Sequence, residues 1–544
     1  MRDPEPARRP GSKHSRPSID LRLLRTSLSS KNAAKPENAV LVQSVRHMHT
    51  VSSNDQDRGS SHSYKKPHTV ISKTVVFARR WAKVVGPGIL ISVAYLDPGN
   101  FSTATSAGAQ FRFKLLFITF LSNCFALYLQ AISCQLGTVT GLDLATCCRV
   151  HLPRWLNYII YAFAEVCIIA TDIAEVIGSA IALNILFNIP LTAGITITTL
   201  DVLLVLLAWR PRGSMRGLRF FEAFVACLVA AVVICFIILL ANVSNIDATE
   251  VMKGFLPSKT LFEKDALYCS VGILGATVMP HSLFLGSGLV QPRLREYDLQ
   301  HNNVIVSDFE YNDTIYRPTL DAIRSTLAFS IAEVAVSLLT FAFFVNSAIL
   351  IVAGATLSDI PDAADADLFA INHLLRSQLS TAAGVIFAVA LLCSGFSGGI
   401  VTTMVGQQIA EGFIQWKIRP WLRRLLTRCI ALIPSLIVAI VVGRSGLNVV
   451  LNATQVILSI ILPIVAGPML YFASSKKVMN VPVLRDDSST ISLFTSDNTS
   501  CHRQNEDHVN MAHGWILSSI SIFVWVFIAG LNLFMLIQMA LGNS

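Results

Sequence analysis

The sequence predicts an all-α membrane protein that crosses the bilayer many times. Hydrophobic residues make up 53% of the 544 residues and charged residues only 14%, a composition that soluble globular domains do not show. Apolar runs of about 20 residues, the length of a membrane-crossing helix, recur along the chain. The net charge of +9 does not indicate nucleic-acid binding, because the basic residues lie between the apolar runs and not on one folded face.

Residues 1–80, before the first apolar run, are predicted to form a disordered, basic cytosolic tail. Seventeen Lys or Arg residues up to Lys83 face only six Asp or Glu residues, and no apolar period is sustained. A mitochondrial transit peptide is also rich in Arg and Ser, but the Pro-rich start with Asp3 and Glu5 argues against one. The tail is a candidate docking segment for trafficking or ubiquitin machinery.

Eleven apolar runs are expected to span the bilayer. Ten lie within residues 81–475, and the eleventh occupies residues 514–541 after a cytosolic loop at 476–513. Lys and Arg are enriched in cytoplasmic loops. With the N-terminus in the cytosol, nineteen basic residues lie in the inner connections and seven in the outer ones, which supports the count and the orientation. The runs begin near Val84, Leu115, Leu156, Leu191, Phe220, Ala266, Leu327, Thr381, Leu425, Val449 and Trp515.

The eleven cysteines do not indicate a disulfide framework or a zinc-finger site. Most of them lie inside predicted spans, where a free thiol packs as a small apolar group. The chain contains no Cys-x-x-Cys pair, so the ligand spacing of a structural zinc site is missing.

The first predicted span is interrupted about midway by Asp97-Pro98-Gly99-Asn100. Proline removes a donor from the helix ladder, and the groups that it frees need partners from protein, water or an ion. A carboxylate at that depth costs about 2.5–3.5 kcal/mol on insertion scales, so the position of Asp97 favours a functional role. In a polar context the same four residues would indicate a surface turn. Here an apolar run precedes them and small residues follow.

The sixth span contains a second interruption, Ala276-Thr277-Val278-Met279-Pro280-His281. Pro280 frees the Ala276 carbonyl, and Met279 adds a thioether. A methionine in an apolar helix is usually a packing residue. Beside a carboxylate, an amide and a free carbonyl, however, its sulfur favours a transition metal such as Mn²⁺ or Fe²⁺ over Mg²⁺ or Ca²⁺. Two interrupted spans, one in each half of a membrane protein, are typical of a transporter's substrate site.

These motifs resemble those of the NRAMP family of proton-coupled divalent metal transporters. The resemblance covers roughly residues 80–475 and is strongest to the fungal Smf-type manganese transporters, which share Met-Pro-His-Ser and Val-Gln-Pro-Arg-Leu. It implies a LeuT-like fold of two inverted five-helix repeats, at about 81–245 and 260–475, with an eleventh helix appended. The matching segments are Gly86-Pro87-Gly88, Ala94-Tyr95-Leu96-Asp97-Pro98-Gly99-Asn100 and Met279-Pro280-His281-Ser282-Leu283-Phe284-Leu285-Gly286-Ser287.

The resemblance also implies the roles of individual residues. Asp172 and Glu175, three residues apart on one helix face, would form a proton relay with His281. A lone helical histidine is also often a hydrogen-bonded structural residue, so that alternative stays open for His281. The implied metal ligands are Asp97, Asn100, the Ala276 carbonyl, Met279 and Gln455.

The implied function is proton-coupled symport of Mn²⁺, and also of Fe²⁺ and other divalent ions, toward the cytosol by alternating access. No enzymatic activity and no resident cofactor are implied, because the metal ions and protons are cargo. A LeuT-like carrier of another small cation or an amino acid would share the broken helices without needing a thioether, and a non-transporting receptor would not need the buried carboxylate. The sequence leaves open which metal is the cargo and whether the protein lies in the plasma membrane or in an endosomal or vacuolar membrane.

Overall fold

The computed structural model describes residues 86–198, 215–243, 246–301, 316–358, 360, 363, 366–415, 420–482 and 508–541. The chain divides into two units, and all of these residues belong to the second, Lys73–Ser544. The expected N-terminal tail and most of the expected loop at 476–513 lie outside the described residues.

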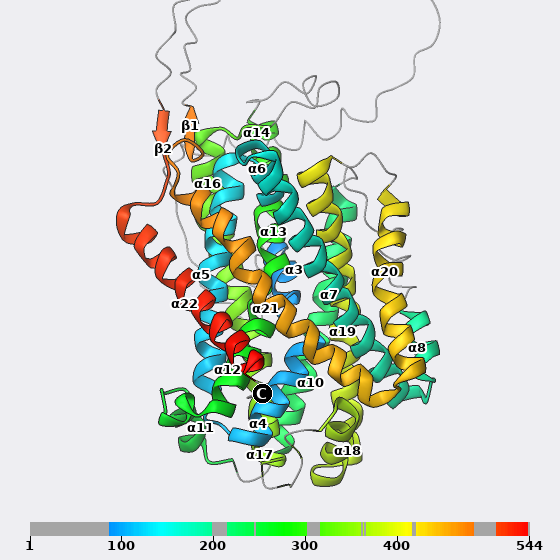
Figure 1. Cartoon of the computed structure of the whole chain (residues 1–544). Helices are drawn as coiled ribbons and strands as arrows, with labels where there is room; N and C mark the ends of the chain where they lie inside the picture. The colour runs from blue at the N-terminus through cyan, green and yellow to red at the C-terminus, as the bar shows by residue number, and fades with distance from the viewer. Residues whose placement is uncertain are drawn as a thin grey trace, which may run out of the picture. The chain divides into compact units, whose positions relative to one another are not determined.

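The described residues are almost entirely α-helical (Figure 1). Eight helical segments are long and apolar enough to cross a bilayer, and each coincides with one of the eleven expected spans. The all-α membrane fold class is thereby confirmed, whereas the count of eleven stays a prediction. The eight segments are Leu116–Thr140, Arg154–Phe187, Phe221–Asn242, Lys264–Gln300, Leu320–Thr356, Thr381–Ile414, Val449–Ser474 and Trp515–Gln538.

The other three expected spans are divided or shorter. The first consists of two helices, α3 (Pro87–Val93) and α4 (Pro98–Phe111). Only the start of the fourth, α8 (Leu191–Ile197), falls within the described residues. The ninth corresponds to α20 (Pro420–Val441), in which the continuous apolar stretch is Leu432–Val441.

Short helices and helix breaks occur within and between the spans. The sixth span is divided into α12 (Lys264–Thr277) and α13 (Pro280–Leu289), and α14 (Gln291–Gln300) follows. A π-helical turn, Leu338–Ala342, joins two helices of the seventh span. The other helices are α5 (Leu116–Thr140), α6 (Leu144–His151), α7 (Arg154–Phe187), α10 (Met215–Asn242), α11 (Ala248–Gly254), α16 (Leu320–Ser337), α17 (Phe343–Thr356), α18 (Leu368–Gln378), α19 (Thr381–Ile414), α21 (Arg444–Ser474) and α22 (Trp515–Ala540), with a 3-10 turn at Lys259–Phe262.

Helices α7 and α19 are each 34 residues long and pack against each other. Helix α7 also touches the interruption between α3 and α4, since Gly178 lies against Pro98 and a Cβ atom at Gly178 would overlap the proline ring. Small residues let membrane helices approach closely. Gly178 therefore lets α7, the helix that carries Asp172 and Glu175, pack directly on the first interruption.

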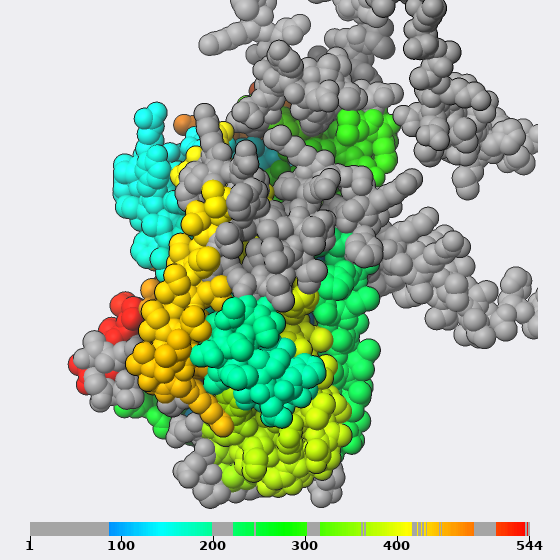
Figure 2. Space-filling model, turned by 90° about the vertical axis from the view of Figure 1, so that its right-hand side faces the viewer, coloured from blue at the N-terminus to red at the C-terminus, as the bar shows by residue number. Residues whose placement is uncertain are grey.

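Large apolar side chains cover the outward faces of the bundle. On α20, which lies beside α8 (Figure 2), Ile430, Ile433, Ile437 and Ile440 are all exposed and recur at helical spacing. Such a continuous apolar face suits a lipid environment and would be unfavourable in water. This face and the eight apolar segments show that the chain is an integral, multi-pass membrane protein.

The last helix is attached to the core by specific contacts. Helix α22 lies along α21 (Figure 1), and its Trp525 Nε1 donates a hydrogen bond of 2.8 Å to the Pro463 carbonyl. The strands β1 (Asn480–Pro482) and β2 (His508–Asn510) pair antiparallel ahead of it. The expected loop at 476–513 is therefore closed at its base by a short β-ladder.

Candidate metal-binding site

The first helix break is formed by the motif that contains Asp97. Helix α3 ends at Val93, and α4 begins at Pro98, whose missing N–H costs nothing at the first position of a helix. Asp97 lies just before this start in an extended conformation, with φ −65° and ψ 147°, and it is only 2% exposed. The break thus holds a carboxylate in the interior of the bundle.

The second helix break has the same construction. Helix α12 ends at Thr277, α13 begins at Pro280, and Met279 lies between them in an extended conformation with φ −74° and ψ 120°. Met279 and Ala276 are fully buried. Pro280 has no N–H to offer the Ala276 carbonyl, so this oxygen is available to another partner.

The two breaks lie side by side. The Tyr95 and Ser282 hydroxyl oxygens are 2.8 Å apart, and Ser282 Oγ donates a hydrogen bond of 2.7 Å to the Met279 carbonyl. The Tyr95 hydroxyl also lies 3.4 Å from Gln130 Oε1, a second acceptor within its reach. The two Ser282 contacts connect one break directly to the other.

Gln455, from the middle of α21, completes the centre of the site. Its Nε2 donates a hydrogen bond of 3.1 Å to Asp97 Oδ2. Asp97 Oδ1 and Gln455 Oε1 are buried and have no hydrogen-bond partner in the described structure. Buried polar atoms normally have partners, so two such oxygens on side chains that are hydrogen-bonded to each other, one of them a carboxylate oxygen, fit a bound cation.

Asn100 lies one helical turn after the first break and is oriented by the backbone. Its Nδ2 donates a hydrogen bond of 3.1 Å to the Tyr95 carbonyl, which also accepts from Asn346 Nδ2 at 3.3 Å. With its nitrogen occupied in this way, the side-chain oxygen of Asn100 is the atom that suits a cation.

The residues of the expected proton relay are buried on helices that contact the two breaks. Asp172 and Glu175 are each 2% exposed on α7, and Glu175 Oε1 accepts a hydrogen bond of 2.7 Å from Thr402 of α19. His281 follows the second break, and its Nδ1 is 3.4 Å from the hydroxyl of Thr171. The structure therefore brings α7 against both breaks.

Three polar residues of this region carried no role in the sequence analysis. Asn346 of α17 contacts the Tyr95 carbonyl, Ser394 of α19 donates a hydrogen bond to the Leu96 carbonyl, and Gln130 of α5 donates one of 3.1 Å to the Ser282 carbonyl. Each is a polar residue within an apolar run, which is the feature of the sequence that could have drawn attention to it, and the structure buries all three. Their contacts arise only from tertiary packing, because each partner lies more than 100 residues away.

The site differs from a structural metal centre. Among the residues that the structure describes, no three His, Cys, Asp or Glu side chains form a group that could hold a metal ion. Fold and site together define a multi-pass membrane protein with buried polar groups between two broken helices.

Comparison with known proteins identifies the family. Residues 88–495 match the model of the natural resistance-associated macrophage protein-like family, and the chain belongs to this family. It is 52% identical over 467 residues to the manganese transporter pdt1 of Schizosaccharomyces pombe, covering 86% of this chain and 87% of that protein. It is 49% identical over 472 residues to the iron transporter SMF3 of Saccharomyces cerevisiae, and this match covers 85% of this chain and 97% of that protein.

The fold agrees with a solved structure of a related transporter. The crystal structure of a manganese transporter from Eremococcus coleocola has a TM-score of 0.68 and 30% sequence identity, and the match covers 87% of this chain and 88% of that one. The LeuT-like fold class is therefore confirmed. The chain belongs to a family of transporters and not of enzymes, and the receptor alternative loses its support.

Proposed function

We propose that this protein carries divalent transition-metal ions, Mn²⁺ or Fe²⁺, through the site between the two helix breaks. The observation that carries the proposal is a pair of buried oxygens, Asp97 Oδ1 and Gln455 Oε1, that have no hydrogen-bond partner among the described residues. Similarity to a manganese transporter, at 52% identity, and to an iron transporter, at 49% identity, supports this class of cargo and is consistent with either metal.

The donor set suits a borderline transition metal. Asp97, Asn100, Gln455 and the Ala276 carbonyl provide oxygens, and Met279 provides a thioether. Hard ions such as Mg²⁺ and Ca²⁺ prefer an all-oxygen shell, so the sulfur favours transition metals over them. A single anionic ligand leaves the affinity moderate, which suits a site that must release its ion on the opposite side.

Proton coupling would use the carboxylates of α7 and His281. A divalent cation at Asp97 favours the deprotonated form of nearby acids. Binding of the metal would therefore release a proton from Asp172 or Glu175 into the pathway that leads away from the site. Transport of both ions in the same direction, toward the cytosol, completes the proposed symport.

Alternating access is supported by the unequal ends of the bundle. At the end that carries α18, a cavity of about 230 Å³ is lined by Ser102, Asn452 and Gln455 and so reaches the site. At the end that carries α14, Glu333 of α16 accepts hydrogen bonds of 2.9 and 3.1 Å from the Gly86 and Gly88 N–H groups and pairs with Arg293. The α14 connection is one of the basic, inner ones, so we infer an open outer side and a closed inner side.

Metal uptake by the purified, reconstituted protein tests this function. Proteoliposomes with an acidic exterior should accumulate Mn²⁺, and dissipation of the pH gradient should slow the accumulation. The Asp97→Ala variant should reconstitute equally well and accumulate no Mn²⁺ above protein-free vesicles. Full Mn²⁺ uptake by Asp97→Ala would rule out the proposed site.

A further inference from the structure

The last helix, α22, contacts the part of α21 that carries Gln455. Ser459 lies one helical turn after Gln455, and its hydroxyl donates a hydrogen bond to Asn532 Oδ1 of α22. The Asn532 nitrogen donates a hydrogen bond of 3.0 Å to the Ile528 carbonyl of its own helix, so the side-chain oxygen is the atom turned toward Ser459. Ser459 is 1% exposed and Asn532 is 4% exposed. A buried polar contact thus joins the two helices next to a proposed metal ligand.

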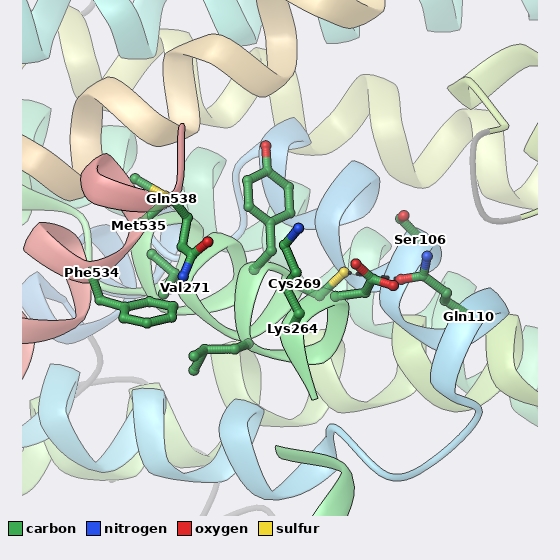
Figure 3. A pocket seen from close by; sticks show the side chains of 11 residues that line it. Ser106, Gln110, Lys264, Cys269, Val271, Phe534, Met535 and Gln538 are labelled. Carbon is green, nitrogen blue, oxygen red and sulfur yellow. Dashed lines mark hydrogen bonds between the residues drawn. The ribbon is translucent and has the colours of Figure 1, made fainter. Parts of the chain in front are cut away.

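Asn532 lies on the buried face of α22 among apolar side chains. Val524, Ile528 and Met535 are buried on the same face. This face is turned toward the core, since Met535 and Val271 of α12 line one cavity of about 380 Å³ (Figure 3). Polar side chains inside a membrane are costly and mark functional positions. Packing alone therefore does not account for an amide at this position.

The contact lies at a weak point of α21. Pro463 is inside α21, and because it has no N–H, the carbonyl of Ser459, four residues earlier, receives no helical hydrogen bond from it. Helices bend at such prolines. Helix α22 bonds to both residues, since Trp525 Nε1 donates to the Pro463 carbonyl at 2.8 Å and Asn532 accepts from Ser459. Helix α22 therefore restrains the segment of α21 before the proline, which includes Gln455.

Ser459 is also in contact with α12. A Cβ atom at Gly275 would lie 2.6 Å from Ser459 Cβ and 3.1 Å from the Gln455 carbonyl oxygen. Gly275 directly precedes Ala276, whose carbonyl is another proposed ligand of the metal. Ser459 therefore packs against the second broken helix and bonds to α22, and both contacts fix the turn of α21 that carries Gln455.

We propose that Asn532 is a positioning residue for Gln455. It holds Ser459, and through Ser459 it holds the turn of α21 from which Gln455 Nε2 reaches Asp97 Oδ2 at 3.1 Å. Asn532 does not itself bind the ion. A ligand that is held in place before binding loses less conformational entropy when the ion arrives, so loss of Asn532 weakens metal binding. The inference rests on the proposed metal site, in which Gln455 is a ligand.

The first test measures whether Asn532 acts through Gln455. The Mn²⁺ dissociation constant of the purified full-length protein is compared for wild type, Asn532→Leu, Gln455→Ala and the double variant. Asn532→Leu keeps the branched shape of the side chain and should raise the dissociation constant severalfold, with no further effect once the Gln455 amide is absent. A merely structural role gives the same fold-change in both backgrounds. That result, or an unchanged dissociation constant in Asn532→Leu, overturns the proposal.

Ser521→Ala is the matched control on the same helix. Ser521 is also buried on α22, but its hydroxyl is 2.8 Å from the Tyr128 hydroxyl of α5, so its loss weakens the attachment of α22 to a different helix. Ser521→Ala should lower the melting temperature and leave the Mn²⁺ dissociation constant unchanged. If Ser521→Ala raises the dissociation constant as much as Asn532→Leu does, any loosening of α22 is sufficient, and a specific role of Asn532 is contradicted.

The second test separates packing from positioning. Ser459→Ala leaves the Asn532 oxygen without its partner, whereas the Ser459→Ala/Asn532→Leu double variant removes both polar groups. Removal of both partners is nearly neutral for stability, while removal of one is not. The melting temperature should therefore recover in the double variant, and the Mn²⁺ dissociation constant should stay raised. Recovery of Mn²⁺ affinity together with the melting temperature contradicts the proposal.

Asp97→Ala is measured alongside these variants to separate the two proposals. If Asp97→Ala loses Mn²⁺ binding and Asn532→Leu keeps the affinity of the wild type, the metal site stands and the role assigned to Asn532 is wrong. If Asp97→Ala keeps the affinity of the wild type, the proposed metal site fails and the role of Asn532 fails with it.

Discussion

At the scale of single residues, the charge on Asp97 dominates the chemistry of the site. A buried carboxylate is costly unless it is paired or hydrogen-bonded, and Gln455 supplies only one hydrogen bond, to Oδ2. A bound divalent cation would offset this cost. Metal binding should therefore raise the free energy of unfolding of the protein, which is measured as a higher melting temperature in the presence of Mn²⁺.

Met279 should determine which metals compete for the site. Replacing it with Ala removes the sulfur and leaves only oxygen donors, so affinity for Cd²⁺ should fall more than affinity for Mn²⁺, and Ca²⁺ should compete better. The measurement is inhibition of Mn²⁺ uptake by Ca²⁺ and by Cd²⁺ in wild type and Met279→Ala. If both proteins give the same inhibition curves, Met279 is a packing residue.

Gly99 keeps space for the Gln455 side chain. A Cβ atom at Gly99 would overlap the Gln455 amide nitrogen and lie 2.7 Å from Asp97 Oδ2. Gly99→Ala should therefore weaken Mn²⁺ binding, and Gln455→Ala should weaken it as well. In the double variant the added methyl group has no amide to displace, so the two effects should be less than additive. Additive effects on the Mn²⁺ dissociation constant contradict this arrangement.

Sequence alone indicates some of these residues and not others. Asp97, Met279 and Pro280 stand out because polar groups and prolines interrupt apolar runs. Gln455 is 358 residues from Asp97, and its place was expected only from the family resemblance. Asn346 and Ser394 were missed because a single buried polar residue in a helix has no local pattern that reveals its partner.

At the scale of helices, the start of α3 is held by the buried carboxylate of Glu333. Its Oε1 accepts the Gly86 and Gly88 N–H groups, and its Oε2 pairs with Arg293, which follows the second broken helix. One side chain thus ties together α3, α14 and α16. Opening of this end would require these contacts to break.

We expect Glu333→Gln to favour the inward-open state, because it removes the negative charge that Arg293 binds. Ser337→Cys provides the probe, since Ser337 is buried and its hydroxyl lies near Gly88. Labelling of this cysteine by a cytosolic thiol reagent should be faster when Glu333→Gln is also present. An unchanged labelling rate argues that Glu333 does not hold the inner side closed.

An ion pair at the opposite end connects α18 to α21. Arg444 donates hydrogen bonds of 2.6 and 2.7 Å to Asp367 at the start of α18. Burial acts to raise the pKa of Asp367, but the hydrogen bonds from Arg444 and from the Ala370 N–H outweigh it and hold the pKa below its usual value. The ion pair should therefore persist when the outer side is acidified.

The pH dependence of stability tests this ion pair. Because the folded-state pKa is lowered, the stabilisation is present above the unfolded-state pKa of about 3.9 and disappears as the pH falls through the folded-state value. Asp367→Asn should lower the melting temperature at pH 7, and the difference from wild type should vanish at strongly acidic pH. A difference that grows with acidification contradicts the lowered pKa.

At the scale of helices, the broken first and sixth spans were predictable because each contains a proline beside polar residues. The π-helical turn that separates α16 from α17 was not predictable, since Leu338–Ala342 is an ordinary apolar sequence. The β-ladder before α22 was also missed. Its strands are three residues each, too short for alternation to be recognised.

At the scale of the whole molecule, the orientation in the membrane decides the direction of transport. The proposed orientation rests on the excess of Lys and Arg in one set of connections between the spans, the set to which α14 belongs. A tag inserted between Asp486 and Asn510 should be detected only after the membrane is permeabilised, and one near Ala364 should be detected from outside. The reverse pattern would invert the proposed direction and contradict a cytosolic N-terminus.

The central claim is that the unpartnered oxygens of Asp97 and Gln455 bind a transition-metal ion together with Met279. Anomalous scattering from crystals of the protein with Mn²⁺ locates the metal without assumptions about transport. We expect one strong peak within bonding distance of an Asp97 carboxylate oxygen and the Met279 sulfur, and its loss in Asp97→Ala. A strong peak away from both helix breaks, or one that persists unchanged in Asp97→Ala, would contradict the account.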